Sequence, residues 1–324
     1  MGKIEPLDDV IRARLSERFG ASVAAWLDAL PAHAAALAER WAVTFALDDR
    51  GRPRVESGHT SVIFHTRRAT GDPAVLKLTP EPALSREEGA ALTAASTAEH
   101  APLPRLFARD DEAGALLMEA IVPGTVGSER AHVGSAQAAS EPARLAEASS
   151  LEPVARLLLG LRAVEAPAQL APLSDRVAFV FALWERRLGA SEDAQERVPV
   201  ALLERGHELA RSLADSHRGA PSFVHGDLHP GNVLDGGAAR GLVAIDPRPC
   251  VGDPLFDAVD LALWGVADVN AAVDRITAIA ARTGDDPQRL RAWCGALAAL
   301  VAASLAMAPG ASERRLALLL ALAA

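Results

Sequence analysis

The chain has 324 residues, half of them apolar and 23% charged, which is the composition of a globular protein with room for two domains. Its formal net charge of −9 argues against binding nucleic acid or an anionic membrane through charge alone; it suits a cationic ligand only weakly, since acidic balance also serves solubility. Cys250 and Cys294 form no paired-cysteine motif, so neither a zinc site nor a disulfide framework is indicated, and we expect a reducing cytoplasm.

The N-terminal ten residues carry acids where a signal peptide needs basic and then apolar residues, so we do not expect export. From Leu7 to about Arg40 the apolar positions recur at helical spacing, with a break expected at Pro31. This pattern predicts two or three helices. Ala292–Ala308 is uncharged but rich in small residues, which predicts a buried core helix rather than a membrane span.

A strand and hairpin are predicted next, because Trp41–Leu47 alternates with period two and runs into the turn Asp48–Pro53. Glu56–His65 follows as a candidate loop over nucleotide phosphates. Its Gly58 permits close backbone approach, and hydroxyl donors come from Ser57, Thr60 and Ser61. On its own this segment is equally a polar hairpin turn.

Lys77 stands among apolar residues of the predicted strand Val75–Leu78. A lysine buried there costs several kcal/mol of desolvation unless it meets an anion, and the α- and β-phosphates of ATP would be that anion. A helix at about Leu84–Ala95 and strands at Arg105–Ala108 and Ala115–Glu119 complete this region.

Residues 125–150 are rich in Ala, Ser, Glu and Gly, which predicts a mobile surface segment or a weak helix. Helical periodicity then returns in Val154–Leu161, Val177–Leu188 and Val200–Leu213. A further helix is predicted at the segment that begins with Gly252.

The most informative stretch is Phe223–Leu234, closed by Val243–Pro247. It packs His225, Asp227 and Asn232 into eight positions, and Asp246 follows fourteen residues after the asparagine. Transfer of a γ-phosphoryl group needs one carboxylate near the attacking hydroxyl and separate oxygen ligands for Mg²⁺. We expect Asp227 to orient the hydroxyl and take its proton, Asn232 and Asp246 to hold the metal, and His225 to brace the loop.

This arrangement of His-x-Asp-x-x-x-x-Asn followed by Ile-Asp-Pro resembles the aminoglycoside phosphotransferases, small-molecule kinases of protein-kinase-like fold. Ala244–Asp257, Glu56–Ser61 and Ala74–Leu78 look like the streptomycin 6-kinase and hydroxyurea kinase branch. The resemblance runs from about Trp41 to the last helices.

The resemblance implies an α+β, bilobal fold with an antiparallel sheet and helices in a small N-lobe and a larger, mainly helical C-lobe. The N-lobe would take residues 1–119, a hinge residues 120–124 and the C-lobe residues 125–324. It implies ATP or GTP with Mg²⁺ as cofactors. Glu88 would pair with Lys77, and the backbone at Glu119, Ala120 and Ile121 would meet the adenine.

Departures from the protein-kinase pattern point to a small acceptor. Gly226 stands where those enzymes carry an arginine that reads a phosphorylated loop, and only six residues separate Asp246 from Asp253. There is no room for an activation loop, so we expect a constitutively competent enzyme for a small alcohol, such as the antibiotic streptomycin.

A polycationic acceptor needs carboxylates and aromatic walls. The candidates downstream of the catalytic stretch are Asp257, Asp260, Asp268 and Trp264. Each is equally explained as an exposed acid or a core tryptophan, and Asp257 also suits the first turn of a helix, as Asp253 suits an N-cap. Arg248 would repel a polycation.

Four alternatives stay open. Gly226–His229 and Asp215-Ser-His217 also fit a metallophosphoesterase, although no histidine follows His229. The second alternative is that the loop is a chance feature of a nonenzymatic domain. The third is a kinase whose acceptor is hydroxyurea or another small compound, and the fourth is a nucleotide-binding pseudokinase.

Overall fold

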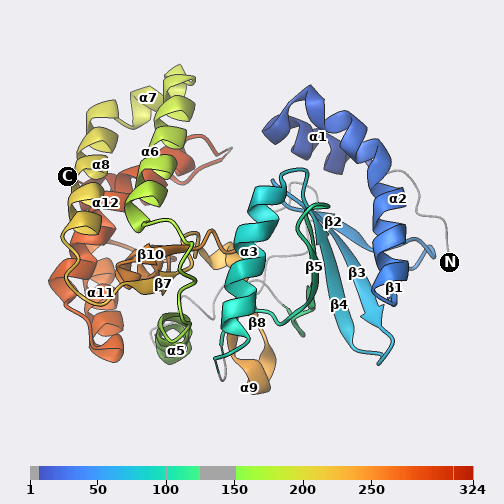
Figure 1. Ribbon diagram of the computed structural model, residues 1–324. Coiled ribbons are helices and arrows are strands. Elements are labelled where there is room, and N and C mark those ends of the chain that lie inside the picture. The colour runs from blue at the N-terminus through green and yellow to red at the C-terminus, as the bar shows by residue number, and fades with distance from the viewer. Residues whose placement is uncertain (1–6, 99–100, 125–150, 309, 324) are drawn as a thin grey trace. The chain divides into compact units, whose positions relative to one another are not determined.

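The computed structural model describes residues 7–98, 101–124, 151–308 and 310–323 (Figure 1). Two compact units form: unit 1 comprises Met1–Thr97 and Leu103–Gly124, and unit 2 comprises Ala98–Pro102 and Thr125–Ala324. The predicted segment 125–150 lies outside the described residues.

Unit 1 begins with helices. α1 (Asp9–Phe19) starts at Asp8, whose Oδ1 accepts the Ile11 N–H at 2.8 Å, and a short 3₁₀ turn, η1 (Ala21–Val23), leads into α2 (Ala24–Arg40). The predicted break at Pro31 is wrong, because α2 runs through it. Burial of Leu27, Leu30 and Leu37 on one face outweighs the hydrogen bond that the proline removes.

A six-stranded antiparallel sheet forms the rest of unit 1, with strand order β1-β3-β4-β6-β5 and β2 also paired to β3. The strands are β1 (Val43–Phe45), β2 (Val55–Ser57), β3 (Val62–Arg68), β4 (Pro73–Leu78), β5 (Leu106–Asp110) and β6 (Ala115–Glu119). One helix, α3 (Pro82–Ala95), contacts β5 and β6.

The two faces of the sheet follow the period-two rule. Phe64, Leu76 and Leu78 join the apolar cluster that also holds the buried residues of α1 and α2. Lys77 lies between Leu76 and Leu78 and therefore points to the opposite face, where α3 packs. The strand period alone thus separates the lysine from the unit's main core.

Unit 2 is built mainly of helices (Figure 1). They are α5 (Leu151–Arg162), α6 (Leu173–Gly189), α7 (Glu192–Arg197), α8 (Val200–Asp215), α10 (Ala258–Leu263), α11 (Val269–Thr283), α12 (Pro287–Ala306) and α13 (Glu313–Ala323). α12 packs against α8 and α13, and its Trp293 is fully buried.

Within the described residues, Ala21–Arg40 and Pro287–Ala306 are long and apolar enough to cross a membrane by length and composition alone. α12 buries ten of its residues inside unit 2, as expected of the core helix predicted at Ala292–Ala308. The packing accounts for its apolar composition.

Two strand pairs lie among these helices: β7 (Ser222–Val224) with β10 (Cys250–Gly252), and β8 (Val233–Asp235) with β9 (Leu242–Ala244). The short elements η3 (Pro230–Asn232) and α9 (Gly237–Arg240) lie between β7 and β8 and between β8 and β9, and η4 (Pro254–Asp257) follows β10 and leads into α10.

Ala98–Pro102 belongs to unit 2, whereas we expected all of residues 1–119 in the first lobe. The carbonyl of Pro102 accepts the Ala244 N–H at 2.8 Å, and Gly160 of α5 packs against the proline ring. These contacts tie the segment to β9 and α5.

Candidate active site

The catalytic loop leaves β7 at His225 and is fastened to the end of β9 through that side chain. Nε2 of His225 lies 3.0 Å from the Ile245 carbonyl oxygen, and Nδ1 lies 3.3 Å from the Asp227 amide nitrogen. Nε2 therefore carries the proton and donates, while Nδ1 accepts. Burial lowers the pKa of His225 to about 4, so the ring is neutral and braces the loop, as the sequence predicts.

A hairpin brings the two expected metal ligands together across fourteen residues of sequence. Val233 pairs with Ala244 in the β8–β9 ladder, and the Ile245 N–H extends it to the Asn232 carbonyl at 2.8 Å. Asp246 then follows directly. The separation in sequence is the length of one hairpin with α9 at its turn.

The Asn232 amide has a defined orientation. Its Nδ2 donates to the Asp227 carbonyl at 2.9 Å, and the side chain is buried. The amide nitrogen is committed to the loop, so Oδ1 is the end of the amide that suits a cation.

Asp246 adopts a left-handed backbone with φ of 57°, one of two non-glycine residues with positive φ in the described chain. Such conformations cost about 1–3 kcal/mol and occur where surrounding structure enforces them, often at active sites. Here the enforcing contacts are the ladder bond at Ile245 and the Arg248 N–H, which donates to the His225 carbonyl at 2.8 Å.

Asp257, one of the candidate substrate contacts, is hydrogen-bonded to the loop that carries Asp227. Its Oδ2 accepts the His225 N–H at 2.6 Å and its Oδ1 accepts the Gly226 N–H at 2.9 Å, and the side chain is buried. Burial raises its pKa to about 7, against the two N–H donors that favour the charged form. Both oxygens already serve the loop.

The remaining substrate candidates lie on or beside α10 and α11. Asp268 caps α11, with Oδ1 accepting the Ala271 N–H at 2.9 Å, and the half-buried Trp264 offers its carbonyl to Arg275. Burial and the nearby Asp227 charge raise the pKa of the half-buried Asp260 to about 7, opposed by Arg315. Contact of these three residues with substrate stays a prediction. Asp253, by contrast, caps η4 through Leu255 N–H and accepts Trp293 Nε1–H at 2.7 Å, as a structural residue would.

In unit 1 the structure joins Lys77 to Glu88, with Nζ and Oε2 2.6 Å apart. Only 8% of the lysine side chain and 3% of the glutamate side chain are exposed. Period two in β4 directs the lysine to α3, and Glu88 lies on the buried face of that helix, whereas Glu87 is exposed.

The segment expected to cover phosphates begins at the end of β2 and turns back into β3. The Gly58 N–H donates to the Ser61 carbonyl at 3.0 Å, and a Cβ on Gly58 would meet only Ser61 Oγ, at 3.7 Å. Ser57 is engaged by Arg14, whose Nη1 donates to its carbonyl at 2.6 Å. The buried Ser61 Oγ has no hydrogen-bond partner in the described chain. Thr60 lies in the same turn.

At the end of unit 1, Glu119 closes β6 and binds Arg105 through both backbone and side chain. The Ala120 N–H donates to the Pro73 carbonyl at 3.4 Å, and Ile121 lies beyond the sheet and is half-buried. Of the two expected adenine contacts, the Ala120 amide is therefore already engaged by β4, and Ile121 is the better candidate.

Comparisons with known proteins also indicate a phosphotransferase. Residues 41–308 match the family model described as "Aminoglycoside/hydroxyurea antibiotic resistance kinase". A streptomycin 6-kinase from Streptomyces glaucescens is 30% identical over 82% of this chain and 76% of its own length. A hydroxyurea phosphotransferase from Kitasatospora aureofaciens is 31% identical over 85% of this chain and 72% of its own.

The chain belongs to this kinase family. It is a phosphotransferase that acts on a hydroxyl group of a small molecule, as its relatives are. The metallophosphoesterase and chance-loop alternatives are thereby excluded, and no group of three or more metal-binding side chains occurs within the described residues.

Solved structures confirm the protein-kinase-like, α+β fold. The macrolide 2'-phosphotransferase of Brachybacterium faecium superposes with a TM-score of 0.54 at 21% identity, covering 91% of this chain and 98% of that one. A thermostable mutant of aminoglycoside phosphotransferase APH(4)-Ia, in complex with ADP and hygromycin B, gives 0.54 at 16% identity, covering 90% and 98%.

One residue that contacts the loop of this kinase was not predicted from the sequence: Arg176 of α6. Its Nε donates to the Gly226 carbonyl at 2.7 Å and its Nη2 lies 3.1 Å from Asp227 Oδ1. The pair is fifty-one residues apart and belongs to no motif, so the sequence carries no signal for it beyond an arginine in the first turn of a helix.

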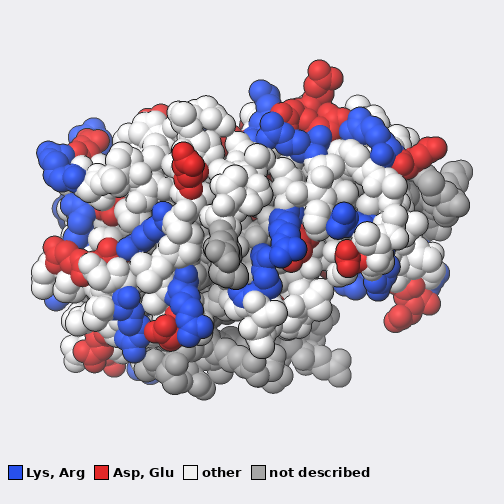
Figure 2. Space-filling model, turned by 60° about the horizontal axis from the view of Figure 1, so that its bottom comes forward, with Lys and Arg blue, Asp and Glu red and all other residues white. Residues whose placement is uncertain are grey.

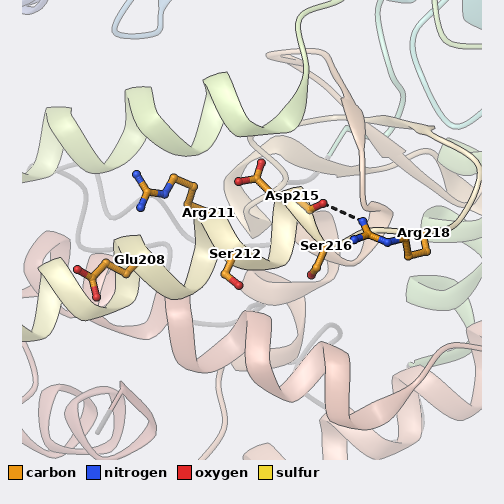
Figure 3. A pocket seen from close by; sticks show the side chains of 6 residues that line it. All are labelled: Glu208, Arg211, Ser212, Asp215, Ser216 and Arg218. Atoms are coloured by element: carbon orange, nitrogen blue, oxygen red, sulfur yellow. Dashed lines mark hydrogen bonds between the residues drawn. The ribbon is translucent and has the colours of Figure 1, made fainter.

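A hollow of about 380 Å³ lies elsewhere on the kinase's surface, along α8 (Figure 3). Its lining residues are Glu208, Arg211, Ser212, Asp215, Ser216 and Arg218. Arg218 Nη1 donates to the Asp215 carbonyl at 3.0 Å, as the dashed line in Figure 3 marks. None of the expected site residues contributes to it.

Proposed function

We propose that this kinase transfers the γ-phosphoryl group of ATP, as its Mg²⁺ complex, to a hydroxyl of an aminoglycoside antibiotic such as streptomycin, and so confers resistance. The observation that carries the proposal is the joined set in unit 2: Asp227 on the loop, Asn232 at its end and Asp246 one hairpin later. These residues supply a base and two oxygen ligands on one rigid frame.

Mg²⁺ fits this donor set. It prefers oxygen ligands in octahedral geometry and usually takes one or two from the protein, with phosphates and water completing the shell. Asn232 Oδ1 and the Asp246 carboxylate are such oxygens, and the metal when bound would neutralise charge on the phosphates. Asp227 orients the acceptor hydroxyl and takes its proton.

Unit 1 carries the proposed nucleotide contacts. Lys77, oriented by Glu88, would hold the α- and β-phosphates, and Ser57, Gly58, Thr60 and Ser61 would cover them. Glu119 and Ile121 would flank the adenine. The ADP bound in the aminoglycoside phosphotransferase APH(4)-Ia supports an adenine nucleotide, and ATP is proposed here over GTP by that analogy.

The acceptor is proposed from the two relatives and from charge. Asp260 is an acidic group near Asp227, and Asp268 and Trp264 follow it, a set that suits ammonium or guanidinium groups. Hydroxyurea is the second candidate, because the hydroxyurea phosphotransferase is as similar as the streptomycin kinase.

No macromolecular partner is proposed. On the face shown in Figure 2, basic and acidic side chains are interspersed, which gives no basic surface for nucleic acid or anionic lipid. With two buried free thiols and a net charge of −9, a cytoplasmic enzyme is the proposal that fits.

The acceptor is tested by incubating the purified protein with Mg²⁺·ATP and a panel of aminoglycosides, macrolides and hydroxyurea, with mass spectrometry of the products. Phosphorylated streptomycin supports the main proposal, and phosphorylated hydroxyurea alone supports the second. ATP binding without phosphorylation of any compound would instead favour a pseudokinase.

Asp227→Asn tests the proton-transfer role of Asp227, with the acceptor that the panel identifies. Asparagine is nearly isosteric but cannot take a proton, so kcat should fall by about 10²–10⁴-fold. Nucleotide affinity, measured by calorimetry, should stay within about threefold, since the proposed partner of Asp227 is the acceptor hydroxyl. Full activity in this variant would contradict the mechanism.

Asp246→Ala tests the metal role. It removes a carboxylate that would hold the metal, so Mg²⁺-dependent binding of ATP should be lost while binding without Mg²⁺ changes little. Calorimetric titrations with and without Mg²⁺ give both numbers. Unchanged affinity in the presence of Mg²⁺ would refute the assignment.

A further inference from the structure

Asp227 projects from its loop with 41% of its side chain exposed. A carboxylate this exposed can adopt several rotamers unless a contact restrains it. The residue before it is Gly226, whose backbone is less restricted than that of other residues. A base that must meet a hydroxyl within hydrogen-bond reach works best when that freedom has already been removed. The loop therefore benefits from an anchor outside its own sequence.

Arg176 makes that contact with two adjacent nitrogens of its planar guanidinium. Nε donates to the Gly226 carbonyl at 2.7 Å and Nη2 to Asp227 Oδ1 at 3.1 Å. The Gly226 carbonyl belongs to the peptide group that immediately precedes Asp227. One rigid fork thus fixes both the plane of that peptide and the direction of the carboxylate.

The two oxygens of the Asp227 carboxylate have different hydrogen-bond partners. Oδ1 is held by Arg176, whereas Oδ2 accepts from Asn232 Nδ2 at 3.5 Å, the outer limit of a hydrogen bond. An oxygen already accepting from a charged donor is the poorer proton acceptor of the pair. Oδ2 is left as the better base.

The arginine itself is anchored to the strands that carry the loop. Val251 of β10 donates its N–H to the Ala171 carbonyl at 3.0 Å, just before α6, and a Cβ on Gly252 would lie 2.6 Å from that of Leu173. β10 pairs with β7, which runs directly into the loop. Arg176 and Asp227 therefore stand on one connected frame.

Its surroundings keep the guanidinium in place and charged. The side chain is only 15% exposed, and the Phe179 ring lies 5.6 Å from it. Burial lowers the pKa of Arg176 from its ordinary value and the Asp227 charge opposes this, but an arginine remains protonated at any pH the enzyme meets.

We propose that Arg176 is a positioning residue that holds Oδ1 of Asp227 and thereby selects Oδ2 as the oxygen that takes the acceptor's proton. The inference rests on the proposed role of Asp227. In the step itself, Asp227 Oδ2 receives the hydroxyl proton while the acceptor oxygen bonds to the γ-phosphorus. The bond from that phosphorus to the β–γ bridging oxygen breaks, and ADP leaves with its electron pair.

The test compares Arg176→Gln and Arg176→Lys with Arg187→Gln, in steady-state assays with Mg²⁺·ATP and the acceptor found in the panel. Arg187 is the matched control, since it lies on the same helix and stacks on the Trp184 ring at 4.9 Å. Arg176→Gln should lower kcat by about 10–10²-fold, since a displaced catalytic group costs this much. Both KM values should stay within about threefold.

Arg176→Lys should recover only part of the loss, because lysine keeps the charge but not the two-point fork. Arg187→Gln should match the parent enzyme. Thermal unfolding is measured for each variant, and failure of both Arg176 variants to fold would overturn the proposal in favour of a purely structural role.

A double-mutant cycle separates this inference from the function beneath it. In the Asp227→Asn background, Arg176→Gln should cause no further loss of kcat, because both changes remove the same positioned base. An equal loss in both backgrounds, or an unchanged kcat in Arg176→Gln, would overturn the role of Arg176. Full activity of Asp227→Asn alone would instead contradict the proposed function.

Discussion

At the scale of single residues, Gly226 shows why this loop does not carry the arginine of protein kinases. Its φ is 76°, and an added Cβ would lie 2.1 Å from the Arg248 carbonyl oxygen. Any side chain would meet both a backbone penalty and a backbone clash. The positive charge beside Asp227, the proposed base, comes from Arg176, on another element.

Gly226→Ala should therefore do more damage than a left-handed alanine alone. The control is Gly241→Ala, because Gly241 has φ of 65° but nothing within 4 Å of an added Cβ. We expect Gly241→Ala to cost about 1–2 kcal/mol, and Gly226→Ala to cost more and to lower kcat. Urea denaturation and steady-state assays measure both, and equal costs would show that the clash with Arg248 relaxes freely.

At the scale of elements, the loop is fixed by its neighbours rather than by itself. The β8–β9 hairpin brings Asp246 to Asn232, His225 crosses to the end of β9, and η4 places Asp257 under two loop amides. Each contact joins segments far apart in sequence. These contacts hold the loop, in which η3 is the one short helical turn between β7 and β8.

Asp257→Asn should loosen the loop. At pH 8 the carboxylate accepts two N–H bonds, whereas an asparagine keeps one accepting oxygen and places an NH2 group, which can only donate, against the second N–H. The expected cost is about 1–3 kcal/mol of unfolding free energy, with a fall in kcat. Asp268→Asn is the control for stability and should leave the unfolding free energy nearly unchanged, because asparagine caps helices as well as aspartate does. A neutral Asp257→Asn would show that the loop holds its shape without this contact.

At the scale of the whole molecule, buried acids make stability depend on pH. Burial raises the pKa values of Asp257 and Asp260 from 3.8 to about 7 in each case. Between pH about 4 and 7 the folded state binds more protons at these groups than the unfolded state does. These groups therefore make the protein less stable as pH rises through that window.

Asp260→Asn should remove part of this decline, because asparagine does not titrate. We expect the variant to be less pH-sensitive than the parent between pH about 4 and 7, in urea denaturation series across that range. Asp274→Asn, at an exposed position on α11, is the control and should leave the slope unchanged. Identical slopes for parent and Asp260→Asn would contradict the raised pKa.

The sequence by itself determined what is local or periodic. Helical spacing predicted α6, α8 and the core helix α12, and the apolar residues around Lys77 predicted its strand, within a fold that the solved structures confirm. The stretch Phe223–Leu234 could be identified from the sequence because its polar residues lie within a few positions of one another and therefore form a motif.

The tertiary structure decided what depends on distant segments meeting. Packing stabilises α2 across Pro31, a hydrogen bond to the Pro102 carbonyl ties that residue to unit 2, and burial places the Asp257 carboxylate on the amides of the loop. Arg176 reached Asp227 across fifty-one residues. A side chain's role at such a distance is set by which backbone groups fold around it, and one sequence contains no periodic signal for that.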